Sequence, residues 1–174
     1  AWVYKISTWN AIKSDNFKYE KLWLGYKSDD KINDKSYKER YAGIDISDIE
    51  KNLGIDSVWR DLIHIDRNLV YHPGKKWRYA FIKQVSDETM LDLVRLNYLI
   101  VRDEIFGEFN PDIIILPNFG SLFHVVLYYF AKQHGINCWM PTATKISGRM
   151  ILTNENNYEL SEVKSQYHSG IARN

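Results

Sequence analysis

The sequence predicts an α/β domain with a mostly parallel sheet. Three segments in succession indicate this fold: four aliphatic residues at 113–116, an apolar helical stretch at 123–132 and a second short strand at 137–140. An unbroken aliphatic run is typical of a parallel strand that is buried on both faces. Two parallel strands need a helical crossover, which the middle segment supplies. Ligands bind past the carboxyl ends of such strands, so this order also predicts where a site lies.

The segments before this unit predict a mixture of elements. Residues 2–8 carry β-branched and aromatic side chains, which favour a strand. Residues 28–40 are almost wholly polar and indicate an exposed loop or a solvated helix face. Ser47 and Glu50 have the spacing of a capping box, and Gly54 suits a helix C-cap. A helix of about two turns is therefore expected to end there.

Residues 58–71 allow two interpretations. Apolar and polar side chains alternate over residues 62–66, as in a strand with His64 and Asp66 on one face. Helical spacing fits the same residues equally well. Farther along the chain, residues 79–82 predict a short strand.

A long helix is predicted to begin after Ser86. Acidic residues follow this serine in the first turn, where the helix dipole favours negative charge, and apolar residues then recur every three or four positions. Gly107 and Pro111 are expected to end the helix. The second strand is expected to close at Pro141, and the tail from Ser161 is weakly helical or disordered.

Length and composition predict one domain, with portions at 1–84 and 85–160 and a polar tail at 161–174. The 23 basic and 22 acidic side chains leave a net charge of +1, which does not indicate a nucleic-acid surface. A single cysteine excludes an internal disulfide framework and favours a reducing, cytoplasmic location. No apolar run approaches the length of a membrane span. The start without Met predicts a piece of a longer protein.

The turn at residues 117–121 is the first candidate site. Free backbone N–H groups and the positive end of the following helix suit a phosphate or carboxylate. Gly120 lets a ligand approach, and Asn118 and Ser121 offer side-chain hydrogen bonds. The alternative is that Ser121 only caps the helix and Gly120 only makes the turn. Neither a dinucleotide fingerprint nor a P-loop is present.

Polar side chains also follow the second strand. Thr142 can orient an anionic ligand and Lys145 and Arg149 can contact it, unless the segment is a solvated loop. Two histidines are candidate bases: His64, with an acidic residue two positions on, and His72, in a basic Pro-Gly turn. An exposed strand face and a surface turn account for the same two residues. The histidines lack the short spacing of a zinc motif, so neither a metal nor a cofactor is predicted.

One pattern in the chain resembles a known family. A helix leads into P-D-I-I-I, a buried helix carries A-K-x-x-G-I, and a basic segment follows. The matching residues are Phe109, residues 111–115, Asn118, Ala131, Lys132, Gly135, Ile136, Lys145, Arg149 and Asn154. This pattern is similar to the N-terminal half of surface-polysaccharide (capsule-type) biosynthesis proteins, which are two-lobed glycosyltransferases of GT-B architecture.

The resemblance implies a Rossmann-like three-layer sandwich that forms one lobe of a two-lobed protein. It also implies that this lobe holds a carbohydrate acceptor, while a second lobe holds the nucleotide-sugar donor. The first functional hypothesis is therefore the acceptor-side lobe of a glycosyltransferase, not active alone, with His64 or His72 as its base. The alternative is a Rossmann-like binding module for a nucleotide or phosphorylated small molecule. The aromatic N-terminal region further suggests contact with a second lobe or another copy of the chain.

Overall fold

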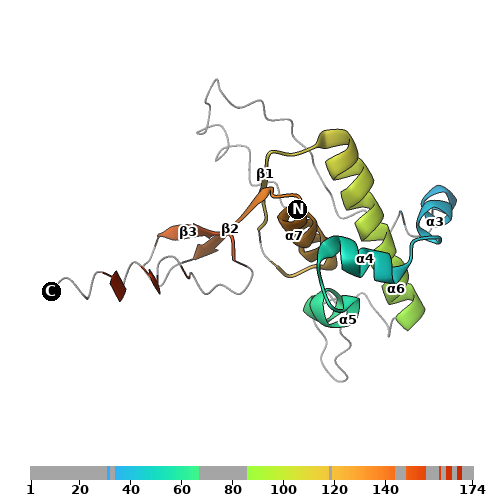
Figure 1. Cartoon of the computed structure of the whole chain (residues 1–174), viewed down its shortest axis with the longest axis horizontal. Coiled ribbons are helices and arrows are strands. Elements are labelled where there is room, and N and C mark those ends of the chain that lie inside the picture. Colours follow the sequence, from blue (N-terminus) through green and yellow to red (C-terminus); the bar gives the residue numbers. More distant parts are fainter. Residues whose placement is uncertain are drawn as a thin grey trace.

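The computed structural model describes residues 31, 34–66, 86–117, 119–143 and 148–155, together with residues 161, 164, 165, 168 and 169. Within these residues the chain forms several helices and one small sheet (Figure 1). The elements are α3 (Lys35–Tyr41), α4 (Ile46–Leu53), α5 (Val58–Asp61), the 3-10 helix η1 (Ile63–Ile65), α6 (Asp87–Leu99), the π-helix η2 (Ile100–Phe109), β1 (Ile113–Ile115), α7 (Leu122–Gln133), β2 (Asn137–Ala143) and β3 (Met150–Thr153). The strands expected at 2–8 and 79–82 lie outside the described residues.

The sheet corrects the predicted fold class. It contains three strands in the order β1-β2-β3, of which β1 and β2 are parallel and β2 and β3 antiparallel. The prediction of a mostly parallel, Rossmann-like three-layer sandwich is therefore wrong. The crossover from β1 through α7 to β2 is present, with Ile114 opposite Cys138. After β2, however, the described chain returns as the antiparallel strand β3, so the strand added next to β2 on that side is not parallel.

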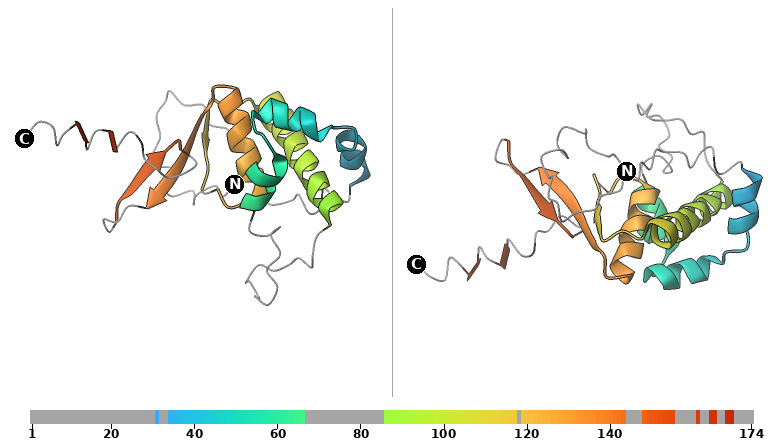
Figure 2. Two further views of the ribbon diagram at one scale, coloured as in Figure 1. Left: turned by 60° about the horizontal axis from the view of Figure 1, so that its bottom comes forward. Right: turned by 90° about the horizontal axis from the view of Figure 1, so that it is seen from above.

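Helix α7 lies between the sheet and the other helices (Figure 2). Its side chains are buried on nearly every side, as its apolar sequence predicts, and Val125, Val126 and Ala131 are fully buried. Phe130 contacts the ring of Tyr98 on α6. Each fully buried aliphatic side chain contributes about 1.5–3 kcal/mol relative to an exposed one, so α7 holds the main core together.

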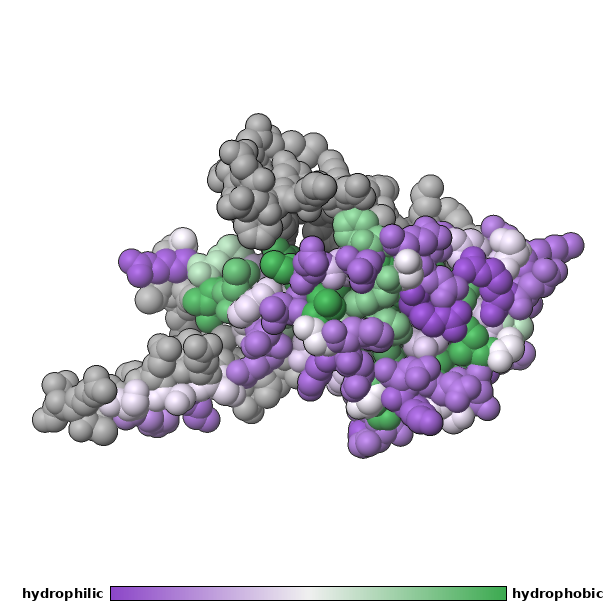
Figure 3. All heavy atoms as spheres, turned by 45° about the horizontal axis from the view of Figure 1, so that its top comes forward, coloured by the Kyte–Doolittle hydropathy of each residue, from purple (hydrophilic) through white to green (hydrophobic). Residues whose placement is uncertain are grey.

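The outer face of the sheet is apolar and open in the described part of the chain. Ile113, Met150 and Leu152 expose 49%, 59% and 59% of their surface. Figure 3 shows hydrophobic atoms at the sheet end of the molecule, whereas the helical end is largely hydrophilic. A three-layer sandwich covers this face with helices, and none of the described helices does so.

The helix ends follow local signals, with one correction. The Asp45 side chain accepts a hydrogen bond from the Ser47 N–H at 2.9 Å, so Asp45 caps α4 and the capping box predicted at Ser47 is wrong. Gly54 ends α4 with a φ of 63°, as its position predicts. Ser86 caps α6, because its side chain accepts from the Thr89 N–H.

Three other elements differ in length or type from the prediction. Residues 58–66 form α5 and η1, so their strand interpretation is wrong. The long helix continues past Gly107 as the π-helix η2 and ends before Asn110, which adopts a φ of 48°. Strand β2 does not close at Pro141, which pairs with Leu152 of β3.

Candidate binding site at the start of helix α7

The turn between β1 and α7 is held from both sides. The Leu116 N–H donates to the Trp139 carbonyl at 2.8 Å, so the pairing with β2 extends one residue beyond β1. Phe119 is 9% exposed and packs edge-on against Tyr128 of α7, with ring centroids 4.7 Å apart. Gly120 lies in the same turn and is half-buried. The turn is therefore anchored at the carboxyl end of the parallel strands, where the sequence places a site.

A carboxylate from elsewhere in the chain occupies the start of α7. The Leu122 N–H donates to Asp66 Oδ2 at 2.7 Å, and Asp66 is only 3% exposed. The His124 N–H donates to the Ser121 hydroxyl at 3.4 Å, so Ser121 caps the helix. The first N–H groups of a helix attract anions. Here two of those groups already hold side chains of the protein itself.

Asp66 is the site residue whose role the sequence does not predict. The sequence places it beside His64 as an orienting partner, because the two lie two positions apart. In the structure His64 is exposed on η1, whereas Asp66 is buried against α7. The partner of Asp66 is 56 residues away along the chain. No local sequence pattern identifies this contact, because Asp66 and Leu122 lie far apart along the chain.

His124 is a neutral imidazole inside the core. It is 6% exposed, and burial lowers its pKa to about 4. Its Nδ1 atom is buried and has no hydrogen-bond partner among the described residues.

Thr142 lies on β2 at the same end of the sheet. It is three residues beyond Trp139, which corresponds to about 10 Å along an extended strand. Side chains alternate along a strand, so Thr142 shares a face with Cys138 and Met140, both buried. Its Oγ1 atom is buried and lacks a hydrogen-bond partner within the described ranges. We call the residues gathered at the start of α7, Asp66, Ser121 and His124, the α7 cluster.

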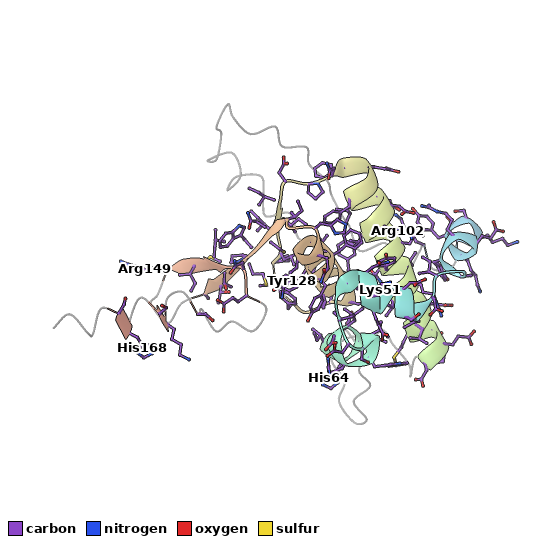
Figure 4. All side chains as sticks on the ribbon, in the orientation of Figure 1. Lys51, His64, Arg102, Tyr128, Arg149 and His168 are labelled. Carbon is purple, nitrogen blue, oxygen red and sulfur yellow. The ribbon has the colours of Figure 1, made fainter. Side chains whose placement is uncertain are left out.

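Among the other predicted site residues that the structure describes, Gly120 adjoins Ser121, whereas His64 and Arg149 lie on separate elements. Figure 4 shows His64, a residue of η1, and Arg149, at the end of β3, well apart from each other. Arg149 is exposed. Asn118, Lys145 and His72 lie outside the described residues.

The described residues limit the chemistry in other ways. They contain no group of three or more His, Cys, Asp or Glu side chains that could hold a metal ion. Burial raises the pKa of the Cys138 thiol to about 12, so the sulfur is protonated and unreactive at neutral pH. None of the described helices is both long and apolar enough to cross a membrane.

Comparisons with protein-family models, with curated proteins and with solved structures found no match to this chain. The α7 cluster offers a carboxylate, a neutral imidazole and one hydroxyl group. Side chains of this kind hydrogen-bond hydroxyl groups of a ligand and do not supply positive charge.

Proposed function

We propose that this chain binds a neutral, hydroxyl-rich carbohydrate acceptor at the α7 cluster, as the acceptor-binding part of a glycosyltransferase of surface-polysaccharide biosynthesis. The observation that carries the proposal is the 2.7 Å hydrogen bond from the Leu122 N–H to Asp66. A carboxylate and a neutral imidazole at the same helix terminus suit sugar hydroxyl groups, which both donate and accept hydrogen bonds. The sequence resemblance supplies the carbohydrate class. A sugar donor and the transfer step belong to a second part of such an enzyme.

The second candidate is binding of a nucleotide or a phosphorylated small molecule at the turn before α7. A phosphate there would compete with the Asp66 carboxylate for the Leu122 N–H. It would also bring negative charge close to a buried carboxylate, which is unfavourable. The occupied helix terminus therefore favours the neutral acceptor over the anion.

Ligand-induced thermal stabilisation separates the two candidates. We expect glucose, galactose or N-acetylglucosamine at millimolar concentration to raise the melting temperature, and inorganic phosphate or uridine diphosphate not to do so. Stabilisation by phosphate or the nucleotide, with none by the saccharides, would contradict the proposal.

Substitution of Asp66 sharpens this test. Asp66→Ala leaves a buried N–H without its charged acceptor and is expected to cost about 2–3 kcal/mol of stability, whereas Asp66→Asn keeps an oxygen and costs less. Both variants should lose saccharide binding, and Asp66→Ala should gain phosphate binding at the vacated helix terminus. Glu50→Gln is the matched control, because Glu50 accepts from the Val58 N–H at 2.9 Å away from the cluster. It should leave both ligand responses unchanged.

A further inference from the structure

Helix η2 has a hydrogen-bond pattern that is unusual for its length. It continues α6 without a break and leads toward β1 (Figure 1). All 10 of its residues are in π turns, and the Asn110 N–H closes the last turn by donating to the Ile105 carbonyl at 2.7 Å. Most π-helices are single turns within an α-helix, and they often lie at functional sites. A longer one depends on contacts with the rest of the fold.

The amino-acid sequence of the same segment also fits an α-helix. Four apolar residues follow one another at intervals of four, three and four positions, which is the spacing of one α-helical face: Val94, Tyr98, Val101 and Ile105. All of them are buried in the structure. This apolar face is therefore compatible with two continuations of α6, which we call the α register and the π register.

The contact of η2 with α7 is specific to the π register. The centroid of the Phe106 ring lies 4.7 Å from that of Phe130 and 5.3 Å from that of His134. A π turn holds nearly one residue more than the ~3.6 residues of an α turn, so Phe106 moves by about a third of a turn between the registers. In the α register Ile105, seven residues after Tyr98, lies on the same face as Tyr98 instead. The two registers thus present different side chains to α7.

The contacts of Glu104 are also specific to the π register. Its carboxylate accepts hydrogen bonds from Lys31 Nζ at 2.9 Å and from the hydroxyl of Tyr37 on α3. The Lys31 and Glu104 side chains are 26% and 27% exposed, so the ion pair between them is partly buried. In the α register Glu104 moves by about a quarter of a turn, which breaks both contacts. Lys31 and Tyr37 therefore stabilise the π register.

We propose that residues 100–109 are a two-register helix, in which the contacts of Glu104 with Lys31 and Tyr37 select the π register and their loss selects the α register. Over the length of η2 the change rotates the end of the helix by about half a turn. This end leads directly into β1, and the turn after β1 starts α7 at Leu122. The register of η2 thus couples the α3 side of the molecule to the α7 cluster.

NMR couplings across backbone hydrogen bonds identify the register directly. In the wild-type chain the Asn110 nitrogen should couple to the carbonyl carbon of Ile105, five residues earlier. In the α register it couples to Phe106, four residues earlier. A nuclear Overhauser effect between the rings of Phe106 and His134 is the second readout, and only the π register produces it.

A double variant shifts the equilibrium toward the α register. Glu104→Gln removes the charge that holds the π register. Gly107→Ala favours an α-helix, because alanine is the better helix former and because its Cβ would lie 3.3 Å from the Arg102 carbonyl oxygen in the π register. In Glu104→Gln/Gly107→Ala we expect couplings between residues four apart, loss of the Phe106–His134 effect and a shift of the Leu122 amide resonance.

Glu108→Gln is the matched control, because it removes the same charge from an exposed position of the same helix. It should retain the wild-type couplings. Gly107→Ala alone should accelerate hydrogen exchange of the α3 amides by up to about fivefold, although the substitution lies on η2, because the α register forfeits the Glu104 contacts.

Three results overturn the proposal. Couplings between residues four apart in the wild-type chain exclude the π register, and couplings between residues five apart in the double variant exclude the switch. A register change that leaves the Leu122 amide resonance in place excludes the coupling to the α7 cluster. If the double variant does not fold, relaxation dispersion of the wild-type amides at residues 104–110 replaces it. Exchange there should increase with salt, which weakens the Glu104 ion pair, and a salt-independent profile overturns the proposal.

Discussion

Among single residues, burial governs two ionisable side chains of the core, His124 and Cys138. It lowers the pKa of His124 to about 4 and raises that of Cys138 to about 12, because the charged form of each group loses its hydration. Both side chains are therefore neutral at pH 7. Neither effect can be calculated from sequence, although the apolar neighbours of His124 on the chain do predict its burial.

The neutral state of His124 makes stability sensitive to mild acid. The unfolded chain protonates this ring near its ordinary pKa of 6.5, whereas the folded chain does so only near 4. The contribution of neutral His124 to the free energy of unfolding is therefore fully present above pH 6.5. It is lost as the pH drops toward 4, by up to about 3 kcal/mol. Urea denaturation between pH 7.5 and 4.5 measures this loss.

His124→Phe should abolish most of that loss, and His64→Asn, on the exposed surface of η1, should preserve it. The carboxylates with a lowered pKa, such as Asp103 and Asp61, titrate below 3.8 and contribute little in this range. An unchanged acid sensitivity in His124→Phe would contradict the assignment.

Individual helices and strands follow signals from a few neighbouring residues. Ser86 caps α6 and Gly54 ends α4 where the sequence places them, because each contact joins backbone and side chain within one turn. The capping box at Ser47 fails for a local reason as well: Asp45, two residues earlier, is an equally good N-cap and starts α4 two residues sooner. Sequence alone does not rank two such caps.

Gly54 allows a more specific prediction, because it combines a positive φ with the close approach of the Gln133 side chain. Alanine at φ 63° costs about 1–2 kcal/mol, and the added Cβ would also overlap the side-chain amide of Gln133, which donates to the Leu53 carbonyl at 3.3 Å. Gly54→Ala should therefore destabilise the protein more than Gly135→Ala, which has a similar φ of 68° and open space. Thermal and urea denaturation provide the measurement.

Two controls separate the backbone effect from the overlap. Gly43→Ala, with open space and no positive φ, should be close to neutral. In a Gln133→Ala background, Gly54→Ala should cost no more than Gly135→Ala. If Gly54→Ala and Gly135→Ala lower the free energy of unfolding equally in the wild-type background, the Gln133 side chain moves aside without cost and the overlap argument is wrong.

On the scale of the whole molecule, contacts between distant segments determine the architecture. Helix α3 joins the body through the ion pair from Arg40 to Asp103 and through the buried side chain of Tyr41, and Lys31, which precedes α3, forms an ion pair with Glu104. The ion pairs are partly exposed and each contributes at most about 1 kcal/mol. Tyr41 is 1% exposed and packs with Leu96, so apolar burial is the stronger attachment.

This difference predicts how α3 responds to substitution. Tyr41→Ala should cost about 3 kcal/mol or more and accelerate hydrogen exchange of the α3 amides. Arg40→Gln should cost less than about 1 kcal/mol, and its effect should diminish at high salt. The reverse order of the two costs would contradict this account of the attachment.

The start of the long helix, the buried character of α7 and the parallel crossover from β1 to β2 are all readable in the amino-acid sequence. Each depends on hydrogen bonds within a few residues or on an unbroken apolar pattern. The sequence does not reveal that β3 pairs antiparallel with β2, that helices cover one face of the sheet, or that Asp66 meets Leu122. Those contacts join segments that are far apart along the chain. Their free energy depends on which surfaces meet in three dimensions, and no short stretch of sequence encodes that choice.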